Sequence, residues 1–368
     1  MQTPKLLFTP GPLTTSPGVK QAAMQDLGSR DKAFIEIVRS IRTSLLELAQ
    51  VSSPLYEAVL MQGSGTFGIE STISSIIPPD GLLLNIVNGA YGRRISQIAT
   101  IYKIPVLELV YEENEVPDLD ELVKTLISNP GITHVAVVHG ETTTGLLNPI
   151  EAIGKIVADF NKVYIVDAMS TFGAYDIDLI KFHISFLISS SNKCIEGIPG
   201  FSFIIGLSKL ITESKSNRRS LSLDLYSQWE GLESDGQFRF TPPVQILIAF
   251  HQALIELSQE GGVAARGKRY QTNNELLVSG MRDAGFKVYL DDKIRSHIIT
   301  SFYYPEDPKF SFESFYQKLN EKGYVIYPGK LSKVDCFRMG NIGQLFPEDI
   351  LALLKAVHET LKEMNLDL

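Results

Sequence analysis

The feature that most constrains the fold is an alternation, from Glu57 to Gly206, of short apolar runs with segments whose apolar residues recur at helical spacing. Parallel strands joined by crossover helices produce this pattern. We expect seven strands, at Ala58–Gln62, Leu82–Asn88, Pro105–Val110, His134–His139, Val163–Asp167, Phe186–Ser190 and Phe201–Gly206. We expect helices between them at Gly68–Ile77, Tyr91–Lys103, Leu119–Ser128 and Ile150–Phe160. The sequence therefore predicts an α/β fold.

The last two of these strands are joined by a short segment that contains Gly197, Pro199 and Gly200. A crossover between parallel strands takes a dozen or more residues, usually including a helix. This segment is too short for one, so we expect the seventh strand to be antiparallel in an otherwise mostly parallel sheet.

The remaining chain predicts a second, smaller unit. The length of 368 residues fits two domains. Further helices are expected at Pro17–Asp26, Lys32–Gln50, Pro243–Gln259, Val263–Ala284, Phe312–Lys322 and Pro347–Met364, and further strands near Lys287–Leu290, His297–Tyr303, Val325–Tyr327 and Cys336–Met339. We predict an N-terminal arm over 1–16 that packs across both domains, a large domain over 17–285, and a small C-terminal α+β domain over 286–368.

Composition excludes several classes of partner. With 34 Lys and Arg against 42 Asp and Glu, the net charge is −8, which disfavours nucleic-acid binding. No apolar run approaches the roughly 20 residues of a membrane span, and the N-terminus lacks the apolar core of a secretory signal. The two cysteines, Cys194 and Cys336, are too few for a disulfide framework. We expect a cytoplasmic protein that binds neither nucleic acid nor a membrane.

A glycine-rich motif follows the first predicted strand. Gly63–Gly68 fits G-x-G-x-x-G, the pattern of a dinucleotide site, but such a site also needs an acidic residue at the end of the next strand. That strand ends at Asn88 instead, which disfavours an NAD-binding oxidoreductase. Ser64, Gly65 and Thr66 at a helix N-terminus can still form an anion cradle. The alternative is an ordinary strand-to-helix turn in which Ser64 is the N-cap.

Two charged residues lie at the ends of later strands. Asp167 ends the strand Val163–Asp167, and Lys193 follows the next strand. Because the carboxyl ends of parallel strands border the ligand crevice of an open α/β sheet, both side chains are expected there. A buried lysine has a lowered pKa and can form an imine with a carbonyl. An anion cradle, an aspartate and a lysine together are typical of a pyridoxal phosphate site.

Motifs along the whole chain carry a family resemblance. They are Leu7–Ser16, Gln62–Thr66, Asn88–Gly92, Glu141–Gly145, Val166–Ser170, Asn192–Cys194, Arg219–Tyr226, Tyr327–Lys330 and Cys336–Gly343. In these motifs the chain resembles the class V, fold type I, pyridoxal-phosphate-dependent aminotransferases. It is most similar to the branch that moves an amine from 2-aminoethylphosphonate to pyruvate in phosphonate catabolism. The resemblance implies that fold, pyridoxal 5′-phosphate as cofactor and a homodimer.

The resemblance also implies roles for single residues. Lys193 would bond the cofactor and move the proton, and Asp167 would hold the pyridine nitrogen. The remaining expected contacts are Ser64, Gly65, Thr66 and Asn192 with the phosphate, Tyr91 with the ring face, Thr143 with the ring 3-oxygen, Thr241 of the second subunit with the phosphate, and Arg338 with the substrate anion.

Other interpretations remain open at this point. The same chemistry could serve a carboxylate donor, as in serine or alanine–glyoxylate transamination. Cys336 invites comparison with cysteine desulfurases, although its apolar strand favours a buried structural role. A binding protein that has lost catalysis is disfavoured because Lys193 and Asp167 are both present. His134 and His139 share one strand without a third ligand nearby, so we expect a structural role for both and no metal site.

Overall fold

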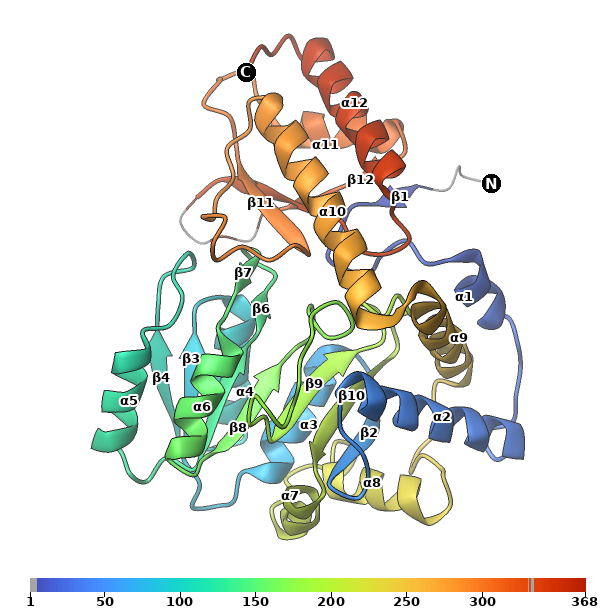
Figure 1. Ribbon diagram of the computed structural model, residues 1–368, viewed down its shortest axis with the longest axis vertical. Helices are drawn as coiled ribbons and strands as arrows, with labels where there is room; N and C mark the ends of the chain where they lie inside the picture. Colours follow the sequence, from blue (N-terminus) through green and yellow to red (C-terminus); the bar gives the residue numbers. More distant parts are fainter. Residues whose placement is uncertain (1–4, 330, 332–333) are drawn as a thin grey trace.

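The computed structural model describes residues 5–329, 331 and 334–368. Its centre is a seven-stranded sheet, in the order β2-β10-β9-β8-β5-β3-β4, that lies below a smaller unit in Figure 1. The strands of the large sheet are β2 (Tyr56–Gln62), β3 (Leu83–Val87), β4 (Val106–Val110), β5 (His134–Val138), β8 (Val163–Asp167), β9 (Phe186–Ser190) and β10 (Phe201–Leu207). All seven strands were predicted, with bounds that differ by at most two residues.

The direction of β10 confirms the prediction for the seventh strand. β10 pairs antiparallel with both β2 and β9, whereas the remaining neighbours in the sheet are parallel. The parallel strands therefore end at one edge, and the segments that follow β5, β8 and β9 meet there. Most of these strands are buried on both faces, which explains why they read as continuous apolar runs.

Helices cover the sheet. They are α2 (Lys32–Leu48), α3 (Gly65–Ile76), α4 (Ala90–Ile101), α5 (Leu119–Ser128), α6 (Ile150–Asp159), α7 (Ser208–Glu213), α8 (Leu225–Ser234) and α9 (Val244–Glu260), with a 3₁₀ turn η1 at Ser214–Ser216. A two-stranded hairpin, β6 (Gly140–Glu141) with β7 (Leu146–Leu147), projects from the edge after β5. Among the described residues, no helix has both the length and the apolar character to cross a membrane.

The smaller unit is built on α10 (Gly262–Asp283), which runs upward from the large sheet in Figure 1. Its other elements are β11 (Ile299–Tyr303), α11 (Phe312–Glu321), β12 (Tyr324–Val325), β13 (Tyr327–Pro328), β14 (Cys336–Gly340) and α12 (Pro347–Glu363). Leu277 and Met281 of α10 pack in the same apolar cluster as Phe302 and Phe337, apart from the core of the large sheet.

The N-terminal segment contacts both units. β1 (Leu6–Leu7) pairs with β12, and the amide of Gly340 donates to the carbonyl of Phe8 at 3.0 Å. The chain then passes along the edge of the large sheet and enters α1 (Pro17–Ala22), whose N-cap hydroxyl is that of Ser16. The first four residues of the predicted arm lie outside the described residues, as does Lys330 of the Tyr327–Lys330 motif.

Three predicted elements are wrong in extent or kind. The helix predicted over Pro17–Asp26 ends at Ala22, because Met24 beyond it is 82% exposed and gives no buried face. The strand predicted at Lys287–Leu290 is a single bridge between Val288 and Phe302, after which the chain turns away. The strand predicted at Val325–Tyr327 is divided between β12 and β13, which belong to different sheets.

Candidate active site

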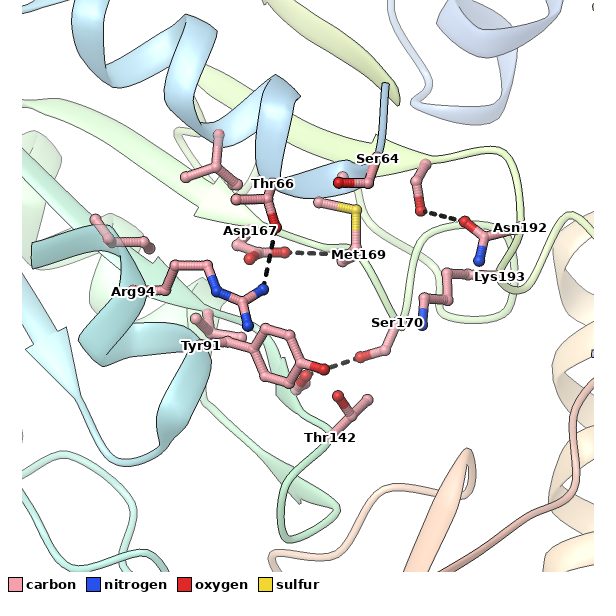
Figure 2. A pocket seen from close by; sticks show the side chains of 16 residues that line it. Ser64, Thr66, Tyr91, Arg94, Thr142, Asp167, Met169, Ser170, Asn192 and Lys193 are labelled. Carbon is pink, nitrogen blue, oxygen red and sulfur yellow. Dashed lines mark hydrogen bonds between the residues drawn. The ribbon is translucent and has the colours of Figure 1, made fainter. Parts of the chain in front are cut away.

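A cavity of about 280 Å³ lies at the carboxyl edge of the large sheet. Figure 2 shows side chains from α3, α4, β8 and the segment after β9 turned toward it. Its lining includes seven of the residues predicted from the sequence: Ser64, Gly65, Thr66, Tyr91, Asp167, Asn192 and Lys193. The fold therefore brings together groups that are up to 129 positions apart, from Ser64 to Lys193.

The N-terminus of α3 forms one wall. Gly63 turns the chain with a φ of +104°, a conformation that favours glycine, and Ser64 follows as the N-cap residue. Ser64 is the N-cap residue by position, but its side chain makes no capping hydrogen bond. Its hydroxyl is therefore not used by the turn itself. A Cβ on Gly65 would lie 2.3 Å from the sulfur of Met169, which shows how closely this backbone approaches the cavity wall. Amides and hydroxyls at a helix N-terminus suit a phosphate.

Asp167 lies at the end of β8 with its side chain almost fully buried. Its Oδ1 accepts a hydrogen bond of 2.9 Å from the amide of Met169. Burial raises the pKa of Asp167 from its usual 3.8 to about 7, and nearby Glu141 adds to the rise, while Arg94 and Lys193 oppose it. A cation placed against this carboxylate would therefore be stabilised in a site that is poorly solvated.

Lys193 follows β9, where its backbone turns out of the sheet. Its Nζ donates a hydrogen bond of 2.7 Å to the carbonyl oxygen of Pro10, in the N-terminal segment. The preceding Asn192 accepts a hydrogen bond of 3.2 Å from the Ser190 hydroxyl, and both residues line the cavity. The amine of Lys193 and the carboxylate of Asp167 thus face the same space (Figure 2).

Tyr91 lies in the first turn of α4, which is held by a carboxylate that the sequence did not single out. Glu141, fully buried in β6, accepts hydrogen bonds from the backbone amides of Tyr91 at 3.2 Å and Gly92 at 3.3 Å. The Thr143 hydroxyl donates to the same carboxylate at 2.9 Å. Burial raises the pKa of Glu141. Gly89 lies two positions before Tyr91, and a Cβ on it would lie 2.2 Å from the Glu141 side chain. Glycine is therefore needed at position 89 for the Glu141 carboxylate to approach this backbone.

Arg94 is a second residue that the sequence did not single out. Its guanidinium lies 4.8 Å from the centre of the Tyr91 ring and donates to the Thr66 hydroxyl at 3.0 Å (Figure 2). Arg94 follows Tyr91 by three positions on α4, and residues at that spacing share one face of a helix. The sequence could have indicated Arg94 as a site residue through this spacing from Tyr91.

Arg338 lies in β14 of the smaller unit and is 2% exposed. Its Nη1 donates to the carbonyl of Thr142 at 2.8 Å, and its Nε donates to the carbonyl of Pro328 at 3.1 Å. Thr142 itself lines the cavity, which places the guanidinium next to that wall. Both of these acceptors are backbone carbonyls rather than carboxylates.

Besides Arg338, two further predicted residues lie outside the cavity lining. Thr143 points its hydroxyl at Glu141, and its neighbour Thr142 lines the cavity instead. Thr241 is exposed on the loop before α9, where its carbonyl accepts a hydrogen bond from the Gln62 side chain. Within a single chain, Thr241 therefore does not meet the other site residues.

Four other residues considered in the sequence analysis lie outside the cavity lining: Asn88, His134, His139 and Cys336. The side chain of Asn88, at the end of β3, donates to Asn148 at 2.8 Å. Burial lowers the pKa of His134 to about 4 and that of His139 to about 3. Cys336 is buried within β14.

Comparisons with known proteins agree with this geometry. The family model described as "Aminotransferase class-V" matches residues 19–332. The 2-aminoethylphosphonate–pyruvate transaminase of Vibrio vulnificus is 50% identical over 363 residues, covering 98% of this chain and 99% of its own. The protein of that name from Vibrio cholerae is 49% identical over 363 residues, covering 98% of this chain and 99% of its own.

Solved structures give the same fold. An alanine–glyoxylate aminotransferase from Nostoc superposes with a TM-score of 0.89 at 27% identity, covering 98% of this chain and 96% of that one. A ureidoglycine–glyoxylate aminotransferase from Bacillus subtilis gives 0.90 at 25% identity, covering 99% and 95%.

Proposed function

Starting from the fact that this chain belongs to the class-V aminotransferases, we propose that it moves the amino group of 2-aminoethylphosphonate to pyruvate, forming phosphonoacetaldehyde and alanine. The observation that carries the choice of substrate is the near 50% identity, over almost the whole chain, to transaminases of that name. The observation that carries the chemistry is the meeting of Lys193, Asp167 and the α3 N-terminus in one cavity.

Class-V aminotransferases depend on pyridoxal 5′-phosphate, and the residues of the cavity fit that group. The N-terminus of α3 offers amides and a Ser64 hydroxyl that takes no part in capping, which suits the phosphate. The buried Asp167 suits a protonated ring nitrogen. When bound, the cofactor supplies an aldehyde that condenses with amines and a ring that withdraws electrons from the substrate carbon.

In the proposed mechanism Lys193 and Asp167 have separate roles. The Nζ of Lys193 would hold the cofactor through its aldehyde and would serve as the base that moves a proton during amino transfer. Asp167 keeps the ring nitrogen protonated, because a carboxylate in a buried site interacts strongly with an adjacent cation.

The other cofactor contacts are proposed from the resemblance. Gly65 and Thr66 bind the phosphate together with Ser64 and Asn192, and Tyr91 lies against the ring face. Thr143 is proposed for the ring 3-oxygen, for which its hydroxyl would exchange the hydrogen bond that it donates to Glu141.

Arg338 is proposed to bind the anionic group of each substrate in turn. A guanidinium presents paired donors that match a phosphonate or a carboxylate. Its Nε and Nη1 are directed at the backbone carbonyls of Pro328 and Thr142, so the side chain is oriented by its surroundings. Because both half-reactions use one pocket, the same arginine serves the amino donor and the amino acceptor.

We also propose a homodimer in which Thr241 completes the phosphate site of the neighbouring subunit. Thr241 is exposed beside the exposed aromatic residue Phe240, and Phe67, which follows Thr66 in α3, is exposed as well. Apolar side chains exposed near an incomplete site suit a subunit contact. We further propose that residues 286–368 act as a small domain that closes with the arm, and that the enzyme resides in the cytoplasm, where its two buried cysteine thiols stay reduced.

A second candidate is transamination of a carboxylate donor such as alanine or serine. It is favoured by the similarity to the alanine–glyoxylate aminotransferase structure, although the identity of 27% is far below that of the phosphonate enzymes. The distinguishing experiment follows the absorbance of the bound cofactor after rapid mixing with 2-aminoethylphosphonate, alanine or serine. The phosphonate should convert the cofactor fastest. If it is inert while serine or alanine reacts, the carboxylate donor replaces it.

A further inference from the structure

A cluster of four charged side chains lies outside the lining of the active-site cavity. Glu196 and Arg266 have side chains that are 2% and 1% exposed, and Arg269 and Glu260 are 10% and 24% exposed. Two acids face two bases, so the formal charges balance. The proposed chemistry uses none of these residues.

Glu196 belongs to the same turn as Lys193. Its amide donates to the Lys193 carbonyl at 2.8 Å, and its backbone has a φ of +67°. This conformation is uncommon for a residue with a side chain, and it turns the carboxylate away from the cavity and toward α10. The backbone of the lysine is thereby tied to the position of this carboxylate.

The carboxylate of Glu196 has partners on two other segments. Its Oε1 accepts from Arg269 at 2.7 Å and from the Tyr270 hydroxyl, both on α10. Its Oε2 accepts from the Gln344 side chain at 2.6 Å. Both oxygens are therefore used, one toward α10 and one toward the segment that follows β14.

Gln344 belongs to the segment that follows the strand carrying Arg338. Arg269 donates to the carbonyls of Gly343 at 2.7 Å and Leu345 at 3.0 Å, so it holds the same segment from α10. The amide of Gln344 donates to the carbonyl of Thr14 at 2.8 Å. One carboxylate thus joins the Lys193 turn, the end of β14 and the N-terminal arm.

Glu260 gives a contrast within the same cluster. It accepts from Arg266 at 2.6 Å and from Arg269 at 2.8 Å, but no hydrogen bond joins it to the Lys193 turn or to Gln344 among the described residues. Glu260 balances charge, whereas Glu196 also bridges segments. Since an apolar cluster of equal volume can stabilise a fold as well as a buried ion pair does, stability alone does not account for a carboxylate at position 196.

We propose that Glu196 is a positioning residue that sets the placement of Lys193 relative to Arg338. It does so by fixing the Lys193 turn against Gln344 and Arg269, and so holds the amine and the anion-binding arginine at the separation that a bound substrate requires. The inference rests on the proposed roles of Lys193 and Arg338. It adds a residue that touches neither cofactor nor substrate.

The test compares three variants of the full-length protein loaded with pyridoxal phosphate: Glu196→Gln, Gln344→Leu and the control Glu260→Gln. Steady-state kinetics give KM and kcat for 2-aminoethylphosphonate and pyruvate. Circular dichroism of the visible cofactor band reports how the cofactor is oriented. Hydrogen–deuterium exchange of 9–16 and 341–345, measured with and without cofactor, reports whether these segments remain attached.

We expect Glu196→Gln and Gln344→Leu to raise KM for both substrates at least fivefold and to speed exchange in 341–345, with or without cofactor. Glu196→Gln should also change the visible dichroism per bound cofactor. Glu260→Gln should lower Tm without these changes. If Glu196→Gln does not fold, the proposal is tested with Gln344→Leu alone, through its KM values and the hydrogen–deuterium exchange of 341–345.

The inference is overturned if Glu196→Gln and Gln344→Leu alter only Tm, as Glu260→Gln does. Failure of the proposed function gives a different result, because the unsubstituted protein would then form no visible band that borohydride fixes on Lys193. A normal band together with variants that match the control therefore rejects the positioning role alone.

Discussion

The amine of Lys193 donates a hydrogen bond of 2.7 Å to the carbonyl oxygen of Pro10, which lies 183 positions earlier in the chain. The next residue, Gly11, has a φ of +113°, and a Cβ there would lie 2.9 Å from both the Lys193 Nζ and the Asn192 carbonyl oxygen. The N-terminal arm is therefore packed directly against the amine, and its fit depends on the absence of a side chain at position 11.

Gly11→Ala should disturb this packing. An alanine at positive φ costs about 1–3 kcal/mol, and its methyl group displaces either the arm or the lysine. We expect cofactor uptake, followed by visible absorbance, to slow by about tenfold. Gly323→Ala is the matched control, since Gly323 also has a positive φ, +96°, and a Cβ there meets nothing within 4 Å. Equal uptake rates for the two variants would show that the arm does not constrain Lys193.

Asp167→Asn should retain the cofactor but lose most turnover. The amide preserves shape, yet it cannot hold a ring nitrogen in its protonated state as a buried carboxylate does. We expect kcat to fall by at least a hundredfold, about 2.7 kcal/mol. Single-turnover mixing with 2-aminoethylphosphonate measures the effect, and near-normal conversion would remove Asp167 from the mechanism.

The cofactor-free protein should lose stability as the pH rises toward neutrality because of Asp167. Its folded pKa of about 7 lies above the unfolded value near 3.8, so the folded state binds the extra proton. That contribution to stability is complete below pH 4 and is lost as the pH rises through 7. Between pH 5 and 8 the loss is about 3 kcal/mol.

The measurement for this pH effect is the difference in unfolding free energy between unsubstituted protein and Asp167→Asn. Taking the difference cancels the opposite contribution of the buried His134 and His139, whose lowered pKa values destabilise the fold in acid. The advantage of aspartic acid over asparagine should shrink from pH 5 to pH 8. A constant difference would mean that Asp167 does not titrate in this range.

Arg338→Lys keeps the charge and loses the paired donors. Because Arg338 is proposed to bind both substrates, we expect kcat/KM to fall at least tenfold, about 1.4 kcal/mol, in both half-reactions. Arg282→Lys, on the exposed surface of α10, is the control. A defect confined to one half-reaction would assign the other anion to a different residue, for which Arg94 is available in the cavity.

Mixed dimers test the proposed role of Thr241. Lys193→Ala and Thr241→Ala should each be inactive as pure proteins. Co-refolding the two variants should recover activity, because a hybrid dimer contains one site with both an intact lysine and an intact threonine. Light scattering of the unsubstituted protein at assay concentration is the companion measurement, and an active monomer would disprove the arrangement.

The sequence predicted the sheet well because its strands are buried on both faces and read as uninterrupted apolar runs. It also placed Asp167 and Lys193 correctly at strand ends that border one cavity. Both successes depend on local pattern combined with a simple rule of topology. The division of Val325–Tyr327 between two sheets could not be foreseen, because it depends on pairing with β1 and β14 rather than on the residues themselves.

The parts of the site that escaped prediction depend on long-range packing. Glu141 appears in a quoted motif, but its role in holding the first turn of α4 depends on contact with a helix 50 positions earlier. Which of the consecutive threonines lines the cavity is decided by the turn after β6, and that turn presents Thr142 rather than Thr143. Arg94 could have been predicted, because it follows Tyr91 by three positions and so shares its face of α4.

The antiparallel pairing of β10 with β2 has a consequence for how the chain is made. Phe201 pairs with Gln62, so 138 residues must be synthesised after β2 before its partner begins to emerge. At about 5–20 residues per second, β2 leaves the ribosome roughly 7–28 s before β10. Until then the apolar edge of the nascent sheet stays uncovered, and the turn that carries Lys193 has no β10 to anchor it. Assembly of the cofactor site therefore has to wait for the synthesis of β10, and a chain interrupted before Phe201 leaves β2 without its partner in the sheet.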